Sequence, residues 1–312
     1  MPARVDAVDV AAAFHDPKRA NILYHDYEAS TYDAKWSISF DDRCTRYARD
    51  RFIAAAGERV AAYPRAVEVG AGTGFFLLNL ARAGIVERGV LTDISPGMVA
   101  QALHHATELG LAVTGLVGDA EAIPLADASA DLVVGHAVLH HLPDVETGLR
   151  EVLRVLRPGG RFVFAGEPSR IGDRYARRLG RITWAVTTRV TRWPALAPRW
   201  ARPLEELDAS SRAAALEAVV DVHTFDPDRL ARAALRAGAV DVRASTEELT
   251  AALVGWPVRT FEAAVNPERL GWGWATAAYR TWQRLMVLDA ALARVVPAAW
   301  YYNVALTGLR PE

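Results

Sequence analysis

Apolar residues in the middle of the chain fall into short runs separated by longer stretches with helical spacing. The short runs, rich in Val, Leu and Ala, lie at 66–69, 89–93, 113–117, 131–138 and 161–165. In the stretches between them, apolar residues recur every three or four positions, which is typical of amphipathic helices. Strands that alternate with helices form a parallel sheet with right-handed crossovers. The pattern therefore predicts an α/β fold with a Rossmann-like, doubly wound sheet.

Two more strands are expected late in the chain. Asp226 and Pro227 open a helix that ends at Gly238, and a short run at 240–244 follows it. The last run, 300–309, is expected to complete a sheet of seven strands.

Helical patterns surround and interrupt this alternating region. We expect residues 1–60 to form an N-terminal helical lid and 61–312 to form the domain itself. Two helical insertions are expected in that domain, at about 168–224 and 246–296. The helices predicted in these added parts include 41–56, about 211–220 and 272–296.

The first insertion begins with a basic amphipathic helix. Nine arginines stand between residues 170 and 203, against one acid, Asp173. The simplest interpretation is a solvated cap that packs its apolar stripe on the domain. A second is contact with a membrane, in which arginines meet anionic headgroups and tryptophans lie at the interface; a third is an acidic acceptor held by arginines. The apolar stripe consists of Ile171, Tyr175, Leu179, Ile182, Val186, Val190 and Trp193, and the tryptophans are Trp184, Trp193 and Trp200.

Composition narrows the class of protein. The 312 residues are 51% hydrophobic and carry a net charge of −1, so we expect no nucleic-acid partner. The single cysteine, Cys44, excludes an intramolecular disulfide and a cysteine-cluster metal site, and we expect no metal. Charges interrupt both the first 16 residues and the apolar stretch 285–309, so neither a signal peptide nor a transmembrane helix is expected. A cytoplasmic location is predicted.

Candidate chemistry gathers at the ends of three predicted strands. A glycine-rich turn, 70–74, follows the first strand and lets a ligand approach the backbone closely. Glu68, Asp93 and Asp119 stand within or just after the first, second and third strands. Because ligands bind at the carboxyl edge of such sheets, these groups describe a nucleoside pocket. Taken singly, Asp93 is also explained as a helix-capping acid and Asp119 as a turn residue.

Six motifs in this order carry a family resemblance. They lie at 67–74, 91–95, 118–125, 131–134, 138–142 and 153–160. Together they resemble class I S-adenosylmethionine-dependent methyltransferases, in the subgroup that includes the ubiquinone/menaquinone biosynthesis methyltransferases. The resemblance covers about residues 60–167 and implies a seven-stranded sheet whose seventh strand is antiparallel.

The resemblance also implies S-adenosylmethionine as cofactor and a role for each site residue. Asp93 takes the ribose hydroxyls, Glu68 contacts the amino group, and Asp119 meets the adenine amine. Many relatives fold an aromatic-rich N-terminal helix over the cofactor, and aromatic faces suit a cationic sulfonium. The lid candidates are Tyr24, Tyr32 and Trp36; the other implied contacts are Gly70, Ala71, Gly72, Gly74, Ile94, Met98, Ala120 and the backbone of His136.

The acceptor is less closely defined. Methyl transfer needs alignment and exclusion of water, and a base if the acceptor is a hydroxyl. His140 is the candidate base, although a structural role for the His140–His141 pair fits as well; His136 and His223 are weaker candidates. We expect O- or C-methylation of a small, apolar or lipid-like acceptor, with peripheral membrane contact through residues 170–203. The oligomeric state stays open.

Two other classes of protein compete. A nicotinamide-dependent oxidoreductase shares the fold, but Phe75 and Phe76 stand where the longer dinucleotide fingerprint has a glycine. Lysines occur only at 18 and 35, which leaves no Tyr-x-x-x-Lys pair. A non-enzymatic protein that binds RNA through the arginines is the other alternative, but no RNA-binding motif is present.

Overall fold

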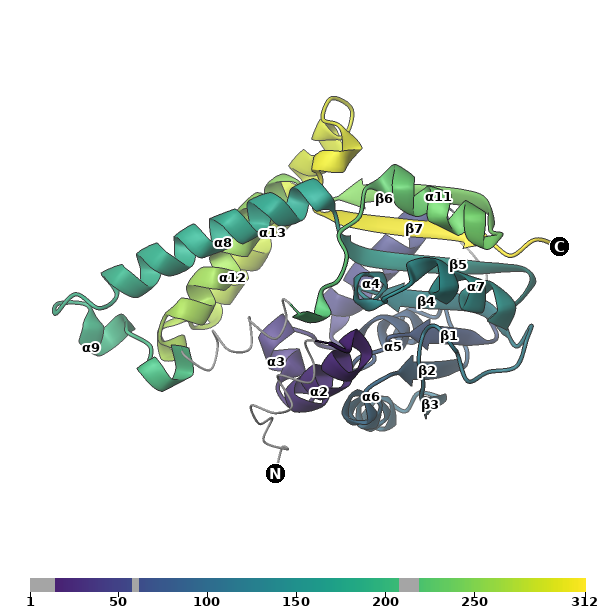
Figure 1. Cartoon of the computed structure of the whole chain (residues 1–312). Helices are drawn as coiled ribbons and strands as arrows, with labels where there is room; N and C mark the ends of the chain where they lie inside the picture. Colours follow the sequence, from purple (N-terminus) through teal and green to yellow (C-terminus); the bar gives the residue numbers. More distant parts are fainter. Residues whose placement is uncertain (1–14, 58–61, 208–218) are drawn as a thin grey trace. The chain divides into compact units, whose positions relative to one another are not determined.

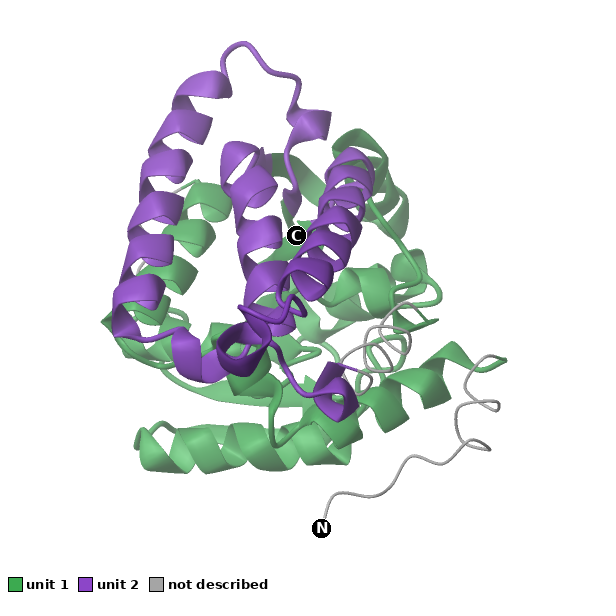
Figure 2. Ribbon diagram, turned by 90° about the vertical axis from the view of Figure 1, so that its left-hand side faces the viewer, with its two compact units in different colours: residues 1–167, 216–245, 305–312 green, residues 168–215, 246–304 purple. Residues whose placement is uncertain are grey.

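The structure is a computed structural model, and it describes residues 15–57, 62–207 and 219–312 (Figure 1). The helix predicted at about 211–220 lies almost wholly outside these residues, as do most of the first 16. The chain divides into two compact units, coloured separately in Figure 2. Unit 1 comprises residues 1–167, 216–245 and 305–312, and unit 2 comprises residues 168–215 and 246–304.

The seven strands form one sheet in the order β3-β2-β1-β4-β5-β7-β6. Strands β1 to β5 are parallel where they pair. Strand β7 runs the other way: Arg310 N–H donates to Gly160 O, and farther along β5 the Thr307 hydroxyl donates to Phe162 O. The predicted fold class, including the antiparallel seventh strand, is confirmed. The strands are β1 (Ala66–Val69), β2 (Gly89–Asp93), β3 (Val113–Val117), β4 (Ala130–His136), β5 (Leu156–Pro168), β6 (Val240–Glu247) and β7 (Asn303–Leu309).

Two helices of unit 1 begin at a capping residue followed by proline. Ser95 accepts a hydrogen bond from Met98 N–H ahead of α6, with Pro96 at the first position, and Asp226 caps α11 in the same way. Gly238, at a φ of +107°, ends α11. The helices of this unit are α2 (Pro17–Glu28), α3 (Tyr32–Trp36), α4 (Asp42–Ala56), α5 (Phe75–Arg82), α6 (Pro96–Glu108), α7 (Val145–Val155) and α11 (Pro227–Ala237), with the short 3-10 turn η1 (Leu139–His141).

The core of unit 1 lies between the sheet and its helices. The first six residues of β4 are fully buried, as expected for a strand covered on both faces. Phe76, Leu77 and Leu80 on α5 bury their side chains against it. This packing makes the sheet a rigid support for the groups at its carboxyl edge.

Unit 2 is helical and contains most of both predicted insertions; the boundaries proposed for the lid and the insertions stay predictions. Its α8 packs mainly against α12, and α12 packs against α13. The final helix of the second insertion ends four residues earlier than predicted, at Leu292, and Trp300 lies in a 3-10 turn before β7. The elements are α8 (Arg170–Val190), α9 (Ala197–Trp200), α12 (Thr250–Ala264), η2 (Pro267–Arg269), α13 (Trp272–Leu292) and η3 (Ala298–Trp300).

Among the helices in the described part of the chain, none combines the length and the apolar character needed to cross a membrane.

Candidate cofactor and acceptor site

The glycine turn between β1 and α5 requires glycine for two reasons. Gly70, Gly72 and Gly74 all have positive φ, at +61°, +53° and +87°. A Cβ on Gly70 would also lie 2.1 Å from Cγ2 of Val138, which is a collision. The turn therefore brings its backbone close to the end of β4, as a ligand-binding turn must.

Glu68 binds the helix that follows this turn. Its side chain is buried in β1, and its carboxylate accepts a hydrogen bond of 3.0 Å from Leu77 N–H, in the first turn of α5. A helix N-terminus can present free N–H groups to a ligand, but here Glu68 already satisfies part of that helix end. Burial raises the pKa of Glu68 to about 8, although these backbone hydrogen bonds oppose the shift. Its contact with a cofactor amino group stays a prediction.

Asp93 joins the glycine turn to the start of α6. One carboxylate oxygen accepts from Gly72 N–H at 2.8 Å, and the other accepts from Ser95 N–H at 2.9 Å. Burial raises the pKa of Asp93 to about 6. The helix-capping and ligand-binding interpretations of Asp93 are compatible, because a carboxylate offers about four acceptor positions. Nearby, Met98 is completely buried and Ile94 is half-buried.

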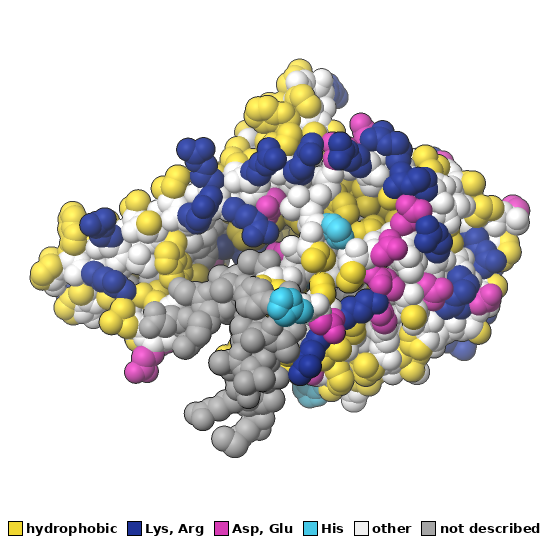
Figure 3. Space-filling model, viewed as in Figure 1, with side chains coloured by type: hydrophobic (Ala, Val, Ile, Leu, Met, Phe, Trp, Pro, Cys, Tyr) yellow, Lys and Arg dark blue, Asp and Glu magenta, His cyan; other side chains and the backbone are white. Residues whose placement is uncertain are grey.

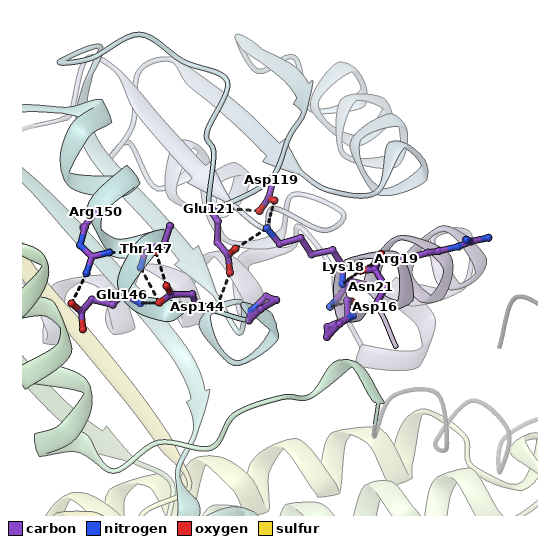
Figure 4. A network of polar contacts seen from close by, with 12 residues as sticks. Asp16, Lys18, Arg19, Asn21, Asp119, Glu121, Asp144, Glu146, Thr147 and Arg150 are labelled. Atoms are coloured by element: carbon purple, nitrogen blue, oxygen red, sulfur yellow. Dashed lines mark hydrogen bonds and ion pairs between the residues drawn. The ribbon is translucent and has the colours of Figure 1, made fainter. Parts of the chain in front are cut away.

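Asp119 is held by a lysine from the lid. Lys18 Nζ on α2 lies 2.5 Å from Asp119 Oδ2 and 2.7 Å from Glu121 Oε2 (Figure 4). Asp119 Oδ1 accepts from Glu121 N–H at 2.9 Å, the local bond of an Asx turn. The structure thus supports the turn interpretation of Asp119. An adenine amine would have to share this carboxylate with Lys18.

Two acids of the lid helices α2 and α3 also hold them to the glycine turn and α6. Asp26 accepts from Gly97 N–H at 2.8 Å and from the Ser95 hydroxyl. Asp33 accepts from the Thr73 hydroxyl at 2.6 Å, and its second oxygen lies 3.2 Å from Nε2 of His105. The lid helices therefore lie over the turn and the N-terminus of α6.

The aromatic side chains of the lid already carry a cation. Lys35 Nζ lies 5.2 Å from the ring centroid of Tyr24 and 5.4 Å from that of Trp36. The same ammonium pairs with Glu28 at 2.9 Å. Tyr32 packs edge-on with His25, 6.0 Å between ring centroids. Lys35 therefore lies over the rings of Tyr24 and Trp36, which the sequence analysis assigned to the cationic sulfonium of the cofactor.

His136, at the end of β4, turns its ring into an aromatic environment. The ring centroid lies 5.2 Å from that of Phe75, 5.5 Å from Phe76 and 6.1 Å from Tyr47. Burial lowers the pKa of His136 to about 4, so the imidazole is neutral at pH 7. Its buried Nε2 has no hydrogen-bond partner among the described residues. An unsatisfied nitrogen at the carboxyl edge fits a site that takes a polar ligand.

His140 is oriented by a buried glutamate. Glu167, at the end of β5, accepts N–H bonds from Val138, Leu139 and His140 and lies 2.9 Å from His140 Nδ1. When Nδ1 donates to this carboxylate, Nε2 carries the lone pair. That Nε2 lies 3.6 Å from an oxygen of Asp221. Such a carboxylate–imidazole pair can accept a proton from a ligand.

His141 and His223 take other positions. His141 lies against His140 with the two rings tilted and their centroids 3.9 Å apart, and its Nδ1 lies 2.9 Å from Val220 O. Ligand atoms of His140, His141 and Asp221 lie within 4.8 Å of one another, a grouping that the sequence did not predict. His223 donates its backbone N–H to His140 O, while its ring lies beside Pro143.

The sequence missed five residues of this site: His25, Asp26, Asp33, Glu167 and Asp221. Glu167 had a usable signal, because it is another acid at the end of a predicted strand. His25 belongs to the aromatic-rich stretch already assigned to the lid, and it reaches His141 with ring centroids 5.4 Å apart. The roles of Asp26, Asp33 and Asp221 depend on contacts between distant segments.

Comparisons with known proteins find methyltransferases that are similar to the region containing the glycine turn and the strand-end acids. Residues 67–164 match the family model described as a methyltransferase domain. A demethylmenaquinone methyltransferase of Beutenbergia cavernae is 35% identical over 160 residues, which cover 51% of this chain and 58% of the relative. A malonyl-[acyl-carrier protein] O-methyltransferase of Methylococcus capsulatus is 36% identical over 138 residues, covering 43% and 47%. The chain thus spans about half the length of these curated relatives.

Similar solved structures support the fold. A phosphoethanolamine N-methyltransferase 2 of Haemonchus contortus, in complex with phosphomonomethylethanolamine and S-adenosylhomocysteine, has a TM-score of 0.55 at 13% identity. The alignment covers 93% of this chain and 60% of that one. The cyclase SpnF has a TM-score of 0.50 at 19% identity, with 86% and 80% covered. A shared fold that also serves a cyclase does not define the reaction by itself.

Proposed function

We propose that this chain, whose residues 67–164 form a class I S-adenosylmethionine-dependent methyltransferase domain, is as a whole a methyltransferase acting on a small, apolar or lipid-like acceptor. The observation that carries the proposal is the carboxyl edge of unit 1. There, three strand-end acids and a glycine turn with positive φ lie under the lid helices. This is the arrangement that a nucleoside ligand requires.

In this proposal the glycine turn and strand-end acids hold S-adenosylmethionine, which supplies an electrophilic methyl group on a cationic sulfur. Asp93 binds the ribose hydroxyls while it keeps its hydrogen bonds to the turn and α6. Asp119 and Ala120 meet the adenine, with Ile94 and Met98 beside it, and Glu68 meets the amino group. The unsatisfied Nε2 of His136 and the glycine backbone are the features of unit 1 that fit such a ligand.

The acceptor in the proposal carries a hydroxyl that has to lose its proton. His140 Nε2 takes that proton, while Glu167 keeps Nδ1–H in place and stabilises the imidazolium that forms. Deprotonation supports methylation at the hydroxyl oxygen and, in a hydroquinone, at the ring carbon made nucleophilic by the oxyanion. The name of one curated relative, a demethylmenaquinone methyltransferase, agrees with a hydroquinone acceptor of this kind.

A binding experiment tests the cofactor first. Isothermal titration of the full chain with S-adenosylhomocysteine, NADH and a short RNA separates the three classes of function. We expect binding of S-adenosylhomocysteine only. Binding of NADH instead would favour the oxidoreductase, and binding of RNA instead would favour the non-enzymatic alternative.

The substitution Glu167→Gln tests the base. The variant keeps the size of the side chain but loses the charge that stabilises the imidazolium, so the turnover number should fall about a hundredfold, with a small change in KM. The assay measures S-adenosylhomocysteine release with a demethylated menaquinol, whose hydroxyl has to lose a proton. Glu146→Gln, at a half-buried glutamate that pairs with Arg150 and Arg236 away from His140, is the matched control. An unchanged turnover number in Glu167→Gln would remove His140 from the mechanism.

The proposal extends to peripheral contact with a membrane through residues 170–203, where an apolar acceptor resides. The alternative is an acidic small-molecule acceptor held by one or two arginines of this segment. Two results together would support this alternative. The affinity for the acceptor would fall when single arginines are replaced, and the protein would not bind membranes.

A further inference from the structure

Helix α8 has three distinct faces, and small residues form the one that packs within unit 2. Gly172, Ala176 and Thr187 are buried along this face. A Cβ on Gly180 would lie 3.3 Å from Oγ1 of Thr260 on α12, so the two backbones approach closely. Small residues of α8 therefore line its closest approach to α12.

The second face carries the predicted apolar stripe, and its latter half is exposed. Ile182, Val186, Val190 and Trp193 expose 54%, 56%, 37% and 61% of their surface. They recur at intervals of four, four and three residues, so they share one side of the helix and the turn after it. These four side chains are therefore exposed on α8 and the turn after it, and packing of the stripe on the domain stays a prediction. An aligned apolar row of this kind marks an interaction surface.

The third face is basic. Arg178, Arg181, Arg189 and Arg192 are exposed beside the apolar row. Among the arginines of α8, only Arg177 pairs with an acid in the described part of the chain, at 2.7 Å from Asp173. Figure 3 shows dark blue and yellow side chains alternating over the region of α8. The apolar row is thus bordered by uncompensated positive charge.

Further tryptophans lie at the end of unit 2 that α8 reaches. Asn266 N–H donates to Trp200 O, and Ala201 pairs with Val265, so the segments after α8 and α12 meet there. Trp272, which begins α13 a few residues later, is 90% exposed. Exposed tryptophans beside arginines are typical of surfaces that enter the headgroup region of a bilayer.

The combination of a basic face and an apolar face indicates which kind of partner fits α8. A second copy of the chain would bring the same arginines against each other in a two-fold contact, which is repulsive. A nucleic acid would match the arginines but leave the apolar row in water. An anionic bilayer satisfies both faces, because phosphates meet the arginines and acyl chains cover the apolar row.

We propose that α8 lies in the surface of an anionic lipid bilayer, with Ile182, Val186, Val190 and Trp193 inserted and the arginines on the headgroups. This deepens the proposed function and rests on it for the lipid-like acceptor. Docking itself needs no catalysis.

Flotation with lipid vesicles tests the proposal on the full chain. We expect it to float with vesicles of phosphatidylcholine and phosphatidylglycerol in equal parts, and to float weakly with phosphatidylcholine alone. Added salt should weaken flotation, because the arginine contribution is screened. Failure of the wild-type chain to float with anionic vesicles would overturn the proposal.

Two matched substitutions separate insertion from charge. Val186→Asp and Ala185→Asp add the same charge at adjacent exposed positions of α8, but only Val186 belongs to the apolar row. Ala185→Asp should weaken binding about fivefold, the effect of one charge, and Val186→Asp at least about tenfold more. Equal effects would exclude insertion of the row.

Two controls keep this result distinct from the proposed function. Circular dichroism verifies that both variants fold, and titration with S-adenosylhomocysteine reports on unit 1 separately. Flotation without S-adenosylhomocysteine binding would retain docking and refute the cofactor assignment; the reverse would refute docking alone. A dimer in light scattering that Val186→Asp dissociates would assign the row to self-association and overturn the proposal.

Discussion

The two units of the chain differ in how far they bury their large apolar side chains. In unit 1, the first six residues of β4 are buried, and α5 buries most of its large side chains. In unit 2, the one buried residue of the 21-residue helix α13 is an acid, Asp289, while Trp272 and Val287 are exposed. Unit 1 is therefore stabilised by a packed core. Unit 2 combines close helix contacts with large apolar side chains that are exposed.

Both units use buried carboxylates to hold backbone N–H groups, but for different ends. In unit 1, Asp93 and Glu167 organise turns at the carboxyl edge of the sheet, where a ligand can use the same oxygens. In unit 2, Asp289 accepts from Leu249, Thr250 and Ala251 N–H, at the start of a helix forty residues earlier. Carboxylates that accept backbone hydrogen bonds therefore order a candidate binding site in unit 1. In unit 2 such a carboxylate takes the place of a side-chain cap at the start of α12.

The largest effect is expected from Asp93→Asn. The amide cannot accept the two ribose hydrogen bonds with charge assistance, so affinity for S-adenosylhomocysteine should fall about a thousandfold. Calorimetry measures the affinity. Asp127→Asn, at an exposed aspartate paired with Arg154, is the control and should bind normally. Wild-type affinity in Asp93→Asn would refute the nucleoside pocket.

Asp289→Ala tests the hydrogen bonds that Asp289 accepts at the start of α12 in unit 2. Three backbone N–H groups and the Thr250 hydroxyl lose their acceptor, so the free energy of unfolding should fall by about 3 kcal/mol. Urea unfolding followed by circular dichroism measures the loss. Affinity for S-adenosylhomocysteine should stay unchanged, because no ligand-site residue of unit 1 is altered. A loss of affinity equal to that of Asp93→Asn would show that the two units cannot be treated separately.

The pH dependence of stability should reveal the buried acid Glu68. Its pKa is raised from 4.5 to about 8, so the folded chain keeps a proton that the unfolded chain releases. Stability should therefore fall as the pH rises from about 6.5 to about 8, by at most about 2 kcal/mol. Below that range the lowered pKa values of His25, His136 and His141 act in the opposite direction, because the unfolded chain binds their protons.

Thermal unfolding of the ligand-free chain at pH 6.5 and pH 8 measures this slope. Glu68→Gln should flatten it, since the amide does not titrate. A slope that is unchanged in Glu68→Gln would assign the proton to another group.

The smallest effect is expected from Lys18→Met. The ion pairs of Lys18 with Asp119 and Glu121 are partly exposed, and such pairs contribute less than about 1 kcal/mol. Affinity for S-adenosylhomocysteine should change by less than about fivefold in calorimetry. A larger loss would mean that Lys18 holds the lid closed over the ligand, and a large gain would mean that it competes with the adenine for Asp119.

Much of unit 1 could be predicted from local patterns. The strands at 89–93 and 113–117 have the predicted bounds, because the strands of a parallel sheet appear as short apolar runs between helix caps and glycine turns. Glu68 and Asp93 lie at the carboxyl edge for the same reason. Glu167 was missed although the same rule applied to it, and Asp119 was linked to a ligand when its nearest partner is a lysine 101 residues away.

Unit 2 was harder to predict because its helices have more than one apolar face. Periodicity located α8 and its stripe, but it did not show which side meets α12. Gly180 carries little hydrophobicity, yet it lies at the close approach to α12, since a residue without a side chain lets two backbones approach. Only the folded chain distinguishes an apolar side chain that is buried from one that is left for a partner.

The sequence by itself determined the alternation of strands and helices, the glycine turn and the acids at the strand ends, because these follow from local spacing and from the chirality of parallel sheets. The tertiary structure decided which partner each charged group has: Lys18 on Asp119, Lys35 over Tyr24 and Trp36, Glu167 on His140. It also decided that the latter half of the α8 stripe faces outward. These contacts join residues far apart in the chain, and no local pattern encodes the distances between them.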